Sequence, residues 1–163
     1  MSDSRVDELV FREVLATFPA GVVVVTAIGA DLQPAGLTVS AFCSVSARPP
    51  LVLVCVDEGS NTLPAIEAAG AYTVNILAAG REELALLFAS KRDDKFAAVQ
   101  WRAADLPRGG PILHEDAAAH AVCEVRETVV AGDHHVFIGE VVEAGFDEGA
   151  TLLYHRRGFA SVG

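Results

Sequence analysis

The chain has 163 residues, of which 52% are hydrophobic, and its 22 acidic residues outnumber its 12 basic ones. A chain of this length buries roughly 70% of the surface that its unfolded form exposes, so we expect residues 1–163 to form a single domain. The acidic excess argues against a nucleic-acid partner, and the lack of a polybasic stretch argues against binding to anionic membranes.

The first predicted element is an amphipathic helix over residues 3–18. Its apolar residues recur at spacings of three and four, the pattern of a helix with one apolar face: Val6, Leu9, Val10, Val14 and Leu15. The chain starts with the acidic stretch "MSDSRVDELVF" rather than a signal peptide's basic region. No apolar run approaches the ~18 to 20 residues that span a bilayer. We therefore expect a soluble, cytoplasmic protein.

Two strands are expected next, joined as a hairpin. The apolar stretches "GVVVVTAIG" and "GLTVSAFCSV" flank the polar turn "GADLQP", which is typical of a hairpin. Because side chains alternate along a strand, Thr38, Ser40 and Phe42 should share one face. That face combines small and hydroxyl-bearing side chains, which would let a flat ligand approach the backbone closely.

The middle of the chain predicts two more strands and two short helices. The stretches "PPLVLVCV" and "AYTVNIL" indicate strands, the first apolar on both faces. Between them "SNTLPAIEAAG" indicates a helix that is capped by Ser60 or Asn61, carries Pro64 in its first turn and ends at Gly70. A second helix is expected over "GREELALLFAS".

The last third of the chain is predicted to return to strands. Residues 92–116 contain the breakers "LPRGGP" and indicate an irregular connection. Residues 120–146 indicate two long strands around "AGDH", and residues 151–159 a last short strand or tail. Six or seven strands against two or three helices predict a mainly β fold, a closed or nearly closed β-barrel with peripheral helices. No dinucleotide-binding or P-loop glycine motif is present in the sequence.

Two stretches could hold a phosphate. The turn "SNT" at residues 60–62 begins a predicted helix, whose N-terminus offers unpaired amides and a partial positive charge. The stretch "FASK" at residues 88–91 ends the other helix with a hydroxyl and opens the basic cluster Lys91, Arg92 and Lys95. An ordinary helix cap and a solvated charged surface explain the same residues.

The histidines and cysteines give little sign of a metal centre. His134 and His135 stand at a turn that opens a strand, where they would alternate faces and could not easily bind one metal ion together. We expect no metal, and a histidine here could instead hold a substrate by hydrogen bonding or stacking. The cysteines lack paired spacing and are predicted to be buried, unreactive thiols: Cys43, Cys55 and Cys123.

Ten stretches, taken in order over about residues 11–160, resemble the flavin reductase family, the small components of two-component flavin monooxygenases. They are "FPAGVVVVTA", "GLTVSAFCSVSARPPLVLVCVD", "SNT", "VNIL", "LALLFAS", "KF", "GGPIL", "CEV", "AGDHHVFIGEV" and "LLYHRRGF". The resemblance implies an FMN-binding split β-barrel that works as a homodimer. It implies hydride transfer from NADH or NADPH to FMN or FAD, and a flavin-dependent monooxygenase as functional partner.

The resemblance also implies site residues. For the flavin they are Thr38, Val39, Ser40, Ala41, Ser44, Ser46, Ser60, Asn61, Thr62, Phe88, Ala89, Ser90 and Lys91. For the nicotinamide nucleotide they are His134, Tyr154, Arg156 and Arg157, with His134 as the catalytic residue that orients the nicotinamide. Relatives often carry an aromatic pair where this chain has "YHRRGF", which indicates an ionic contact with a pyrophosphate or a 2′-phosphate.

Three alternatives remain open at this point. Another oxidoreductase with the same barrel, such as a relative of pyridoxamine phosphate oxidase or a deazaflavin-dependent enzyme, would carry different motifs around the phosphate. A non-enzymatic flavin- or haem-binding barrel would hold its cofactor tightly and would not oxidise NADH. A barrel that has lost its ligand would show neither visible absorbance nor stabilisation by flavin.

Overall fold

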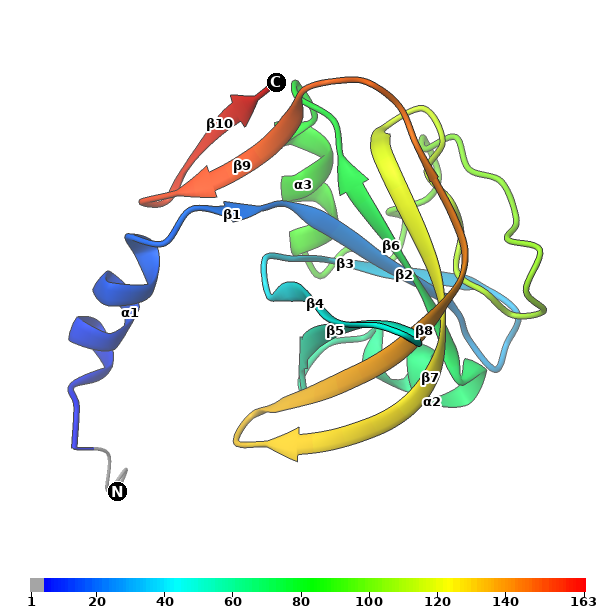
Figure 1. Ribbon diagram of the computed structural model, residues 1–163, viewed down its shortest axis with the longest axis horizontal. Coiled ribbons are helices and arrows are strands. Elements are labelled where there is room, and N and C mark those ends of the chain that lie inside the picture. The colour runs from blue at the N-terminus through cyan, green and yellow to red at the C-terminus, as the bar shows by residue number, and fades with distance from the viewer. Residues whose placement is uncertain (1–4) are drawn as a thin grey trace.

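A computed structural model describes residues 5–163, which form ten strands and three helices (Figure 1). The helices are α1 (Glu8–Ala16), α2 (Leu63–Ala69) and α3 (Glu82–Ala89). The strands are β1 (Ala20–Gly21), β2 (Val23–Ile28), β3 (Pro34–Val39), β4 (Phe42–Ala47), β5 (Pro50–Asp57), β6 (Ala71–Leu77), β7 (Ala117–Ala131), β8 (His134–Phe146), β9 (Thr151–His155) and β10 (Gly158–Val162). The predicted mainly β fold is confirmed, with more strands than the six or seven expected.

The larger sheet closes on itself. Its seven strands run in the order β3-β2-β6-β7-β8-β5-β4, so β3 and β4 are the two edges. Only Ser40 and Ala41 connect these edge strands along the chain, and so short a link reaches no more than about 10 Å. The edges must therefore meet, and β3 does contact β5 across the gap. This confirms the predicted nearly closed barrel, and we call the Ser40–Ala41 link the seam.

The seam overturns one prediction. The hairpin of β2 and β3 forms as expected, with Val25 opposite Leu37. The strand does not continue through residue 40, however, because β3 ends at Val39 and β4 starts at Phe42 in a different part of the barrel wall. The expectation that Thr38, Ser40 and Phe42 share one face of one strand is wrong for this reason.

The core lies on both faces of β2. Val23 and Val25 belong to the cluster inside the barrel, which includes Phe137 and is closed by Ile66 of α2. Val24 faces the other way, into a cluster with residues of α3 and of the segment after it. All five of these side chains are at most 1% exposed. A strand buried on both faces explains the uninterrupted valine run.

Buried polar side chains tie the irregular segment 92–116 to the barrel. The Asn75 side chain donates to the carbonyls of Val24 and Pro111, each at 3.2 Å, and accepts from the amide of Leu113 at 2.9 Å. At Gly110 an added Cβ would lie 2.0 Å from a backbone oxygen of β2. Only glycine allows so close an approach. The predicted irregular connection is confirmed, and these bonds fix its position.

The helices follow the predictions with changes at their ends. The first helix is shorter than predicted and starts after Asp7, whose carboxylate accepts from the amides of Leu9 and Val10; residues 3 and 4 lie outside the described part of the chain. The cap of α2 is Thr62, not Ser60 or Asn61, while Gly70 ends the helix as expected. No helix within residues 5–163 is both long and apolar enough to span a bilayer.

The C-terminal segment is a hairpin rather than a single strand or tail. Strand β9 pairs with β10 on one side and with the short β1 on the other, which makes a separate three-stranded sheet. Arg156 and Arg157 form its turn, with positive φ angles of 49° and 61°. Non-glycine residues adopt this conformation infrequently.

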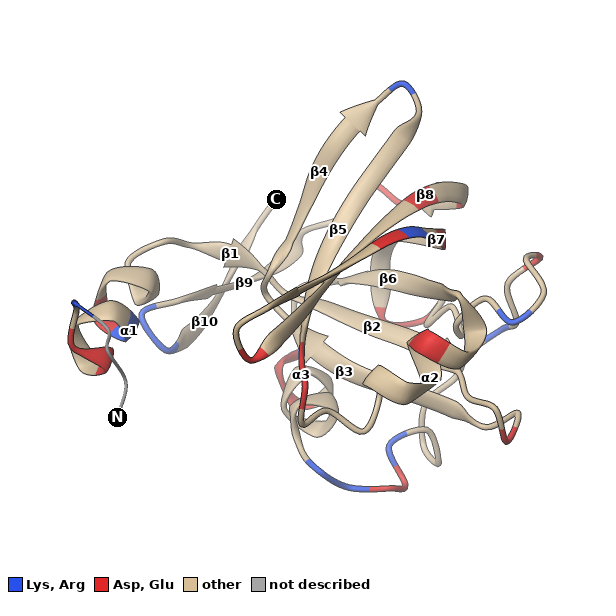
Figure 2. Cartoon of the chain, turned by 90° about the horizontal axis from the view of Figure 1, so that it is seen from below, with Lys and Arg blue, Asp and Glu red and all other residues tan. Residues whose placement is uncertain are grey.

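The cysteine prediction holds only for Cys123. Cys43 is exposed and Cys55 is partly exposed, whereas Cys123 is buried. Burial raises the pKa of the Cys123 thiol to about 12, which keeps it protonated and unreactive. The error arises at Cys43, because β4 is an edge strand of a hairpin that extends away from the barrel (Figure 2).

Candidate functional site

Three segments that are distant in sequence enclose a cavity of about 380 Å³, which we call the polar cavity. They are the end of β3, the loop between β5 and α2, and the segment that ends α3. The lining residues are Leu37, Thr38, Asp57, Ser60, Asn61, Phe88, Ala89, Ser90, Lys91 and Lys95. Seven of the predicted flavin-binding residues are among these lining residues, although their spacing in the sequence does not by itself bring them together.

Hydrogen bonds hold the wall of the polar cavity together. The Lys91 ammonium donates to the carbonyl of Gly59 at 3.0 Å and so joins the end of α3 to the loop after β5. The Ser60 hydroxyl accepts from the amide of Thr62 at 3.1 Å, and the Ser90 hydroxyl donates to the carbonyl of Leu87 at 2.6 Å. An ammonium has three donors, so Lys91 keeps two for an anion in the cavity.

The three residues of the basic cluster, Lys91, Arg92 and Lys95, make different contacts. The Arg92 guanidinium pairs with the Asp94 carboxylate at 2.7 Å, and both side chains are exposed. The Lys95 ammonium donates to the carbonyls of Gly36 and Phe88, each at 3.0 Å, and so fastens this segment to β3 and α3. Partial burial, with Lys91's charge adding to it, lowers the pKa of Lys95. Oppositely charged segments follow each other after α3 (Figure 2).

A second hollow of about 630 Å³, the apolar cleft, lies on the other side of the seam. Its lining residues come from α1, β1, the seam, the β4–β5 hairpin and the β9–β10 hairpin. They are Arg12, Leu15, Ala16, Phe18, Ala20, Ser40, Ala41, Phe42, Cys43, Leu53, Tyr154 and Arg157. Four predicted residues lie here, two from the flavin set and two from the nicotinamide set. Thr38 lines the polar cavity and Ser40 the apolar cleft, so the two hollows are neighbours along the chain.

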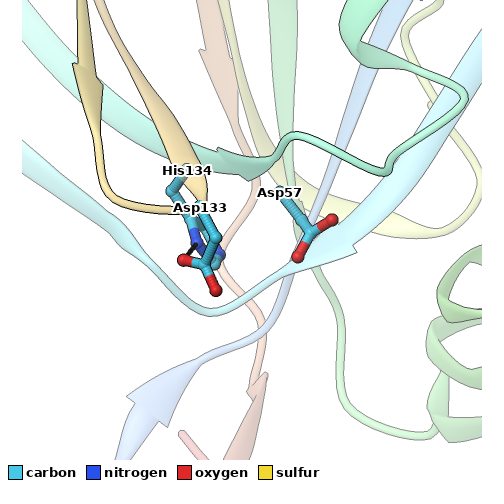
Figure 3. Close-up of side chains that lie close together, drawn as sticks. All are labelled: Asp57, Asp133 and His134. Atoms are coloured by element: carbon cyan, nitrogen blue, oxygen red, sulfur yellow. Dashed lines mark hydrogen bonds and ion pairs between the residues drawn. The ribbon is translucent and has the colours of Figure 1, made fainter. Parts of the chain in front are cut away.

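His134 stands beside the polar cavity. It is the first residue of β8 and pairs with Asp57, the last residue of β5, which lines that cavity. Its Nδ1 lies 2.7 Å from the Asp133 carboxylate, and side-chain ligand atoms of these three residues lie within 4.8 Å of one another (Figure 3). His135 points elsewhere, with its Nδ1 3.6 Å from the Glu67 carboxylate of α2. The predicted alternation of the two histidines is confirmed.

Besides His134, five predicted site residues line neither hollow. Val39 is 8% exposed and belongs to the barrel core. Ser44 and Ser46 lie on β4 in the extended hairpin, and Thr62 is buried at the start of α2. Arg156 is exposed in the C-terminal turn, where its amide donates to the carbonyl of Ala16. The candidate site therefore consists of Thr38, Ser40 and Ala41, the loop after β5 and the end of α3.

Sequence reasoning missed several lining residues. Asp57 directly follows the predicted strand "LVLVCV", and Lys95 belongs to the basic cluster, so both carried a signal. The apolar residues of the cleft carried none, because Phe18, Phe42 and Leu53 look like ordinary core residues in the sequence. Asp133 lines neither hollow. It directly precedes His134, but an aspartate at this position is also typical of an ordinary turn.

Comparison with known proteins gives consistent matches over nearly the whole chain. Residues 15–163 match the model of the flavin reductase like domain. The chain is 41% identical over 162 residues to a flavin reductase (NADH) of Kitasatospora aureofaciens, covering 98% of this chain and 84% of that protein. It is 38% identical over 162 residues to the reductase subunit HsaB of a flavin-dependent monooxygenase from Mycobacterium tuberculosis, with the same two coverages, 98% and 84%.

A solved structure is similar as well. The NADH:FAD oxidoreductase SgcE6 of Streptomyces globisporus, in complex with NAD and FAD fragments, superposes with a TM-score of 0.87 at 35% identity. The match covers 94% of this chain and 92% of that chain.

Proposed function

Because this chain belongs to the flavin reductase like domain family, we propose that it is an NAD(P)H:flavin oxidoreductase that transfers a hydride from NADH or NADPH to FMN or FAD. The observation that carries the proposal is the polar cavity, where Thr38, Ser60 and Lys91 converge from three separate segments. Hydroxyl groups and an ammonium are the donors that a phosphate and a ribityl chain require.

The residues of the two hollows fit the parts of a flavin nucleotide. Lys91 and Ser60 would hold the phosphate in the polar cavity. Thr38, whose hydroxyl donates to the carbonyl of Ala85, would accept a hydrogen bond from the ribityl chain. The small residues of the seam, Ser40 and Ala41, would allow the flavin ring to approach the backbone beside the apolar cleft. When bound, the flavin supplies the ring that accepts the hydride.

The protein's own contribution to the reaction is to bind and orient the two nucleotides. We place His134 at the nicotinamide, since it lies next to Asp57 at the rim of the polar cavity and its imidazole can form a hydrogen bond. Tyr154 and Arg157 line the apolar cleft and would contact the rest of the pyridine nucleotide. Holding donor and acceptor in the reactive geometry lowers the barrier of such a transfer.

The proposal is tested by oxidation of NADH and NADPH by the purified protein, with FMN, FAD or riboflavin added in turn or left out. We expect turnover that requires added flavin, and the relative rates rank the flavins and the pyridine nucleotides in one experiment. Flavin binding without any turnover would contradict the enzyme and support the alternative, a barrel that only binds flavin or haem.

We also propose that the reduced flavin serves a separate monooxygenase component. The support is the 38% identity to HsaB, which is itself named as the reductase subunit of such an enzyme. Reduced flavin that is released reacts with dissolved oxygen, so a reductase of this kind needs a partner that takes up the reduced flavin.

A homodimer is proposed from the uncovered face of α1. The helix extends away from the barrel (Figure 1), and none of its residues is buried. Leu9, Val14 and the nearby Phe18 are 73%, 60% and 75% exposed. The helix is nevertheless held in place, because Arg157 of the C-terminal turn pairs with Glu13 at 2.5 Å. An ordered apolar face of this kind is typical of a subunit interface, and we assign it to a second copy of the chain.

Changing Leu9 to aspartate is expected to weaken the dimer by about thirtyfold, the effect of removing an interface residue that contributes ~2 kcal/mol. Sedimentation velocity at several concentrations measures the change. Leu32→Asp is the matched control, since Leu32 is 70% exposed in the β2–β3 turn on a different part of the surface. A wild-type protein that remains monomeric at high concentration would show that α1 is not a dimer interface.

A further inference from the structure

We infer that Asp133 is a positioning residue for His134: its carboxylate holds the imidazole with the proton on Nδ1, which leaves Nε2 as an acceptor for a donor group of the nicotinamide nucleotide. The inference rests on the proposed function, because it assigns a role to Asp133 in binding the pyridine nucleotide. Asp133 is part of the stretch "AGDHHVFIGEV", but the sequence analysis gave it no role and it lines neither hollow.

The hydrogen bond determines where the ring carries its proton. His134 Nδ1 and the Asp133 carboxylate oxygen lie 2.7 Å apart. An ionised carboxylate can only accept, so Nδ1 must donate, and in a neutral ring the proton is then absent from Nε2. The same hydrogen bond lowers the pKa of Asp133, with the charge of His134 adding to it. Asp133 therefore remains an acceptor throughout the neutral range.

The backbone holds this pair in a fixed place. Asp133 lies in the two-residue turn between Ala131 and His134, which pair across the β7–β8 hairpin. Gly132 provides the positive φ of 60° that the turn needs. The carbonyl of Asp133 accepts from the amide of Glu58 at 2.9 Å, so the turn is fastened to the end of β5. The Asp133–His134 pair is thus attached to the same loop that forms part of the wall of the polar cavity.

His134 lies next to residues that form the wall of the polar cavity. Asp57 lies on the cavity side and already accepts from the amide of Gly59 at 2.7 Å through Oδ1. Lys91 reaches the same loop through the carbonyl of Gly59. Figure 3 shows Asp133 and His134 together on the hairpin turn, with Asp57 opposite them on the end of β5. A nucleotide bound beside the polar cavity would lie close to the imidazole, whose Nδ1 is already engaged by Asp133.

The test uses two variants that each remove one exposed carboxylate from this corner. Asp133→Ala removes the acceptor, and its side chain is 80% exposed, so the fold should be retained. Glu58→Ala is the matched control, because it removes a charge from the neighbouring loop while keeping the backbone bond to Asp133. Both are compared with the wild-type chain after labelling of histidine with nitrogen-15.

The first readout is the two-bond proton–nitrogen NMR spectrum at mildly alkaline pH, where imidazoles are neutral. His134 signals are identified by their loss in His134→Gln. We expect Nδ1–H in the wild type and in Glu58→Ala, and a shift to the Nε2–H form, which free histidine prefers, in Asp133→Ala. Persistence of the Nδ1–H form in Asp133→Ala would overturn the inference, and this readout does not depend on any enzymatic activity.

The second readout is the steady-state kinetics. We expect Asp133→Ala to raise the KM for the pyridine nucleotide about tenfold with a smaller change in kcat and none in the Kd of flavin, because the His134 imidazole would no longer present Nε2 as an acceptor to the substrate. Equal effects of Asp133→Ala and Glu58→Ala would show that only local charge matters and would contradict the positioning role. A wild type without flavin-dependent NAD(P)H oxidation would instead refute the proposed function, and the NMR result would still decide the tautomer.

Discussion

Replacing Lys91 with alanine is expected to raise the Kd of FMN about tenfold and to leave the Kd of riboflavin unchanged. The reason is that the Lys91 ammonium lines the polar cavity and uses one donor on the carbonyl of Gly59, so its remaining donors can pair with a phosphate. A charge-assisted hydrogen bond contributes about 1.5 to 3 kcal/mol, and exposure places this one at the lower end. Quenching of flavin fluorescence on titration measures both constants.

Arg92→Ala is the matched control for Lys91→Ala. Arg92 is the next residue and carries the same charge, but its guanidinium is paired with Asp94 and it does not line the polar cavity. We expect it to leave both dissociation constants within about twofold, the range typical of surface substitutions. If Lys91→Ala weakened FMN and riboflavin equally, the phosphate would have to lie outside the polar cavity.

The His134→Ala variant is expected to lower kcat/KM for NADH or NADPH at least about tenfold, mainly through KM, while the Kd of flavin stays constant. The imidazole lies beside Asp57 at the rim of the polar cavity, where it would orient the nicotinamide by a hydrogen bond. Loss of a substrate-orienting bond of ~1.5 kcal/mol accounts for a tenfold change. Initial rates at varied pyridine nucleotide and saturating flavin give the two parameters separately.

His155→Ala serves as the control for the His134 variant. His155 is exposed at the end of β9 and lines neither the polar cavity nor the apolar cleft. Its kinetics should therefore match those of the wild type. Steady-state kinetics of His134→Ala that equal those of His155→Ala would remove His134 from the proposed site.

The kinds of element, and most of their bounds, could be predicted from local patterns. Alternation and apolar runs gave β2, β5, β6, β7 and β8, and Gly70 correctly ended α2, but β3 and β4 were predicted as one strand. The errors lie where distant parts of the chain meet. Ser60 or Asn61 was predicted as the cap of α2, but Thr62 occupies that position, and Ser60 and Asn61 line the polar cavity. The C-terminal hairpin was missed because its turn uses two arginines with positive φ instead of Asn-Gly.

The candidate site could be predicted only in part for the same reason. The resemblance to a known family supplied Thr38, Ser60 and Lys91, and the structure brings all three to one cavity. No local rule places Lys95 on two backbone carbonyls or Asp133 on His134. Those contacts depend on how β3, β5 and the β7–β8 turn come together.

The sequence by itself determined a mainly β fold and the β2–β3 and β7–β8 hairpins, because hydrophobic period and turn chemistry are local properties. Its motifs also resemble those of the flavin reductase family. The tertiary structure alone decided that the stretch from Thr38 to Phe42 is broken at Ser40–Ala41 rather than continuous. Two residues can link the opposite edges of a seven-stranded sheet only if the sheet closes. That closure, a property of the whole barrel, places the polar cavity and the apolar cleft on either side of the seam.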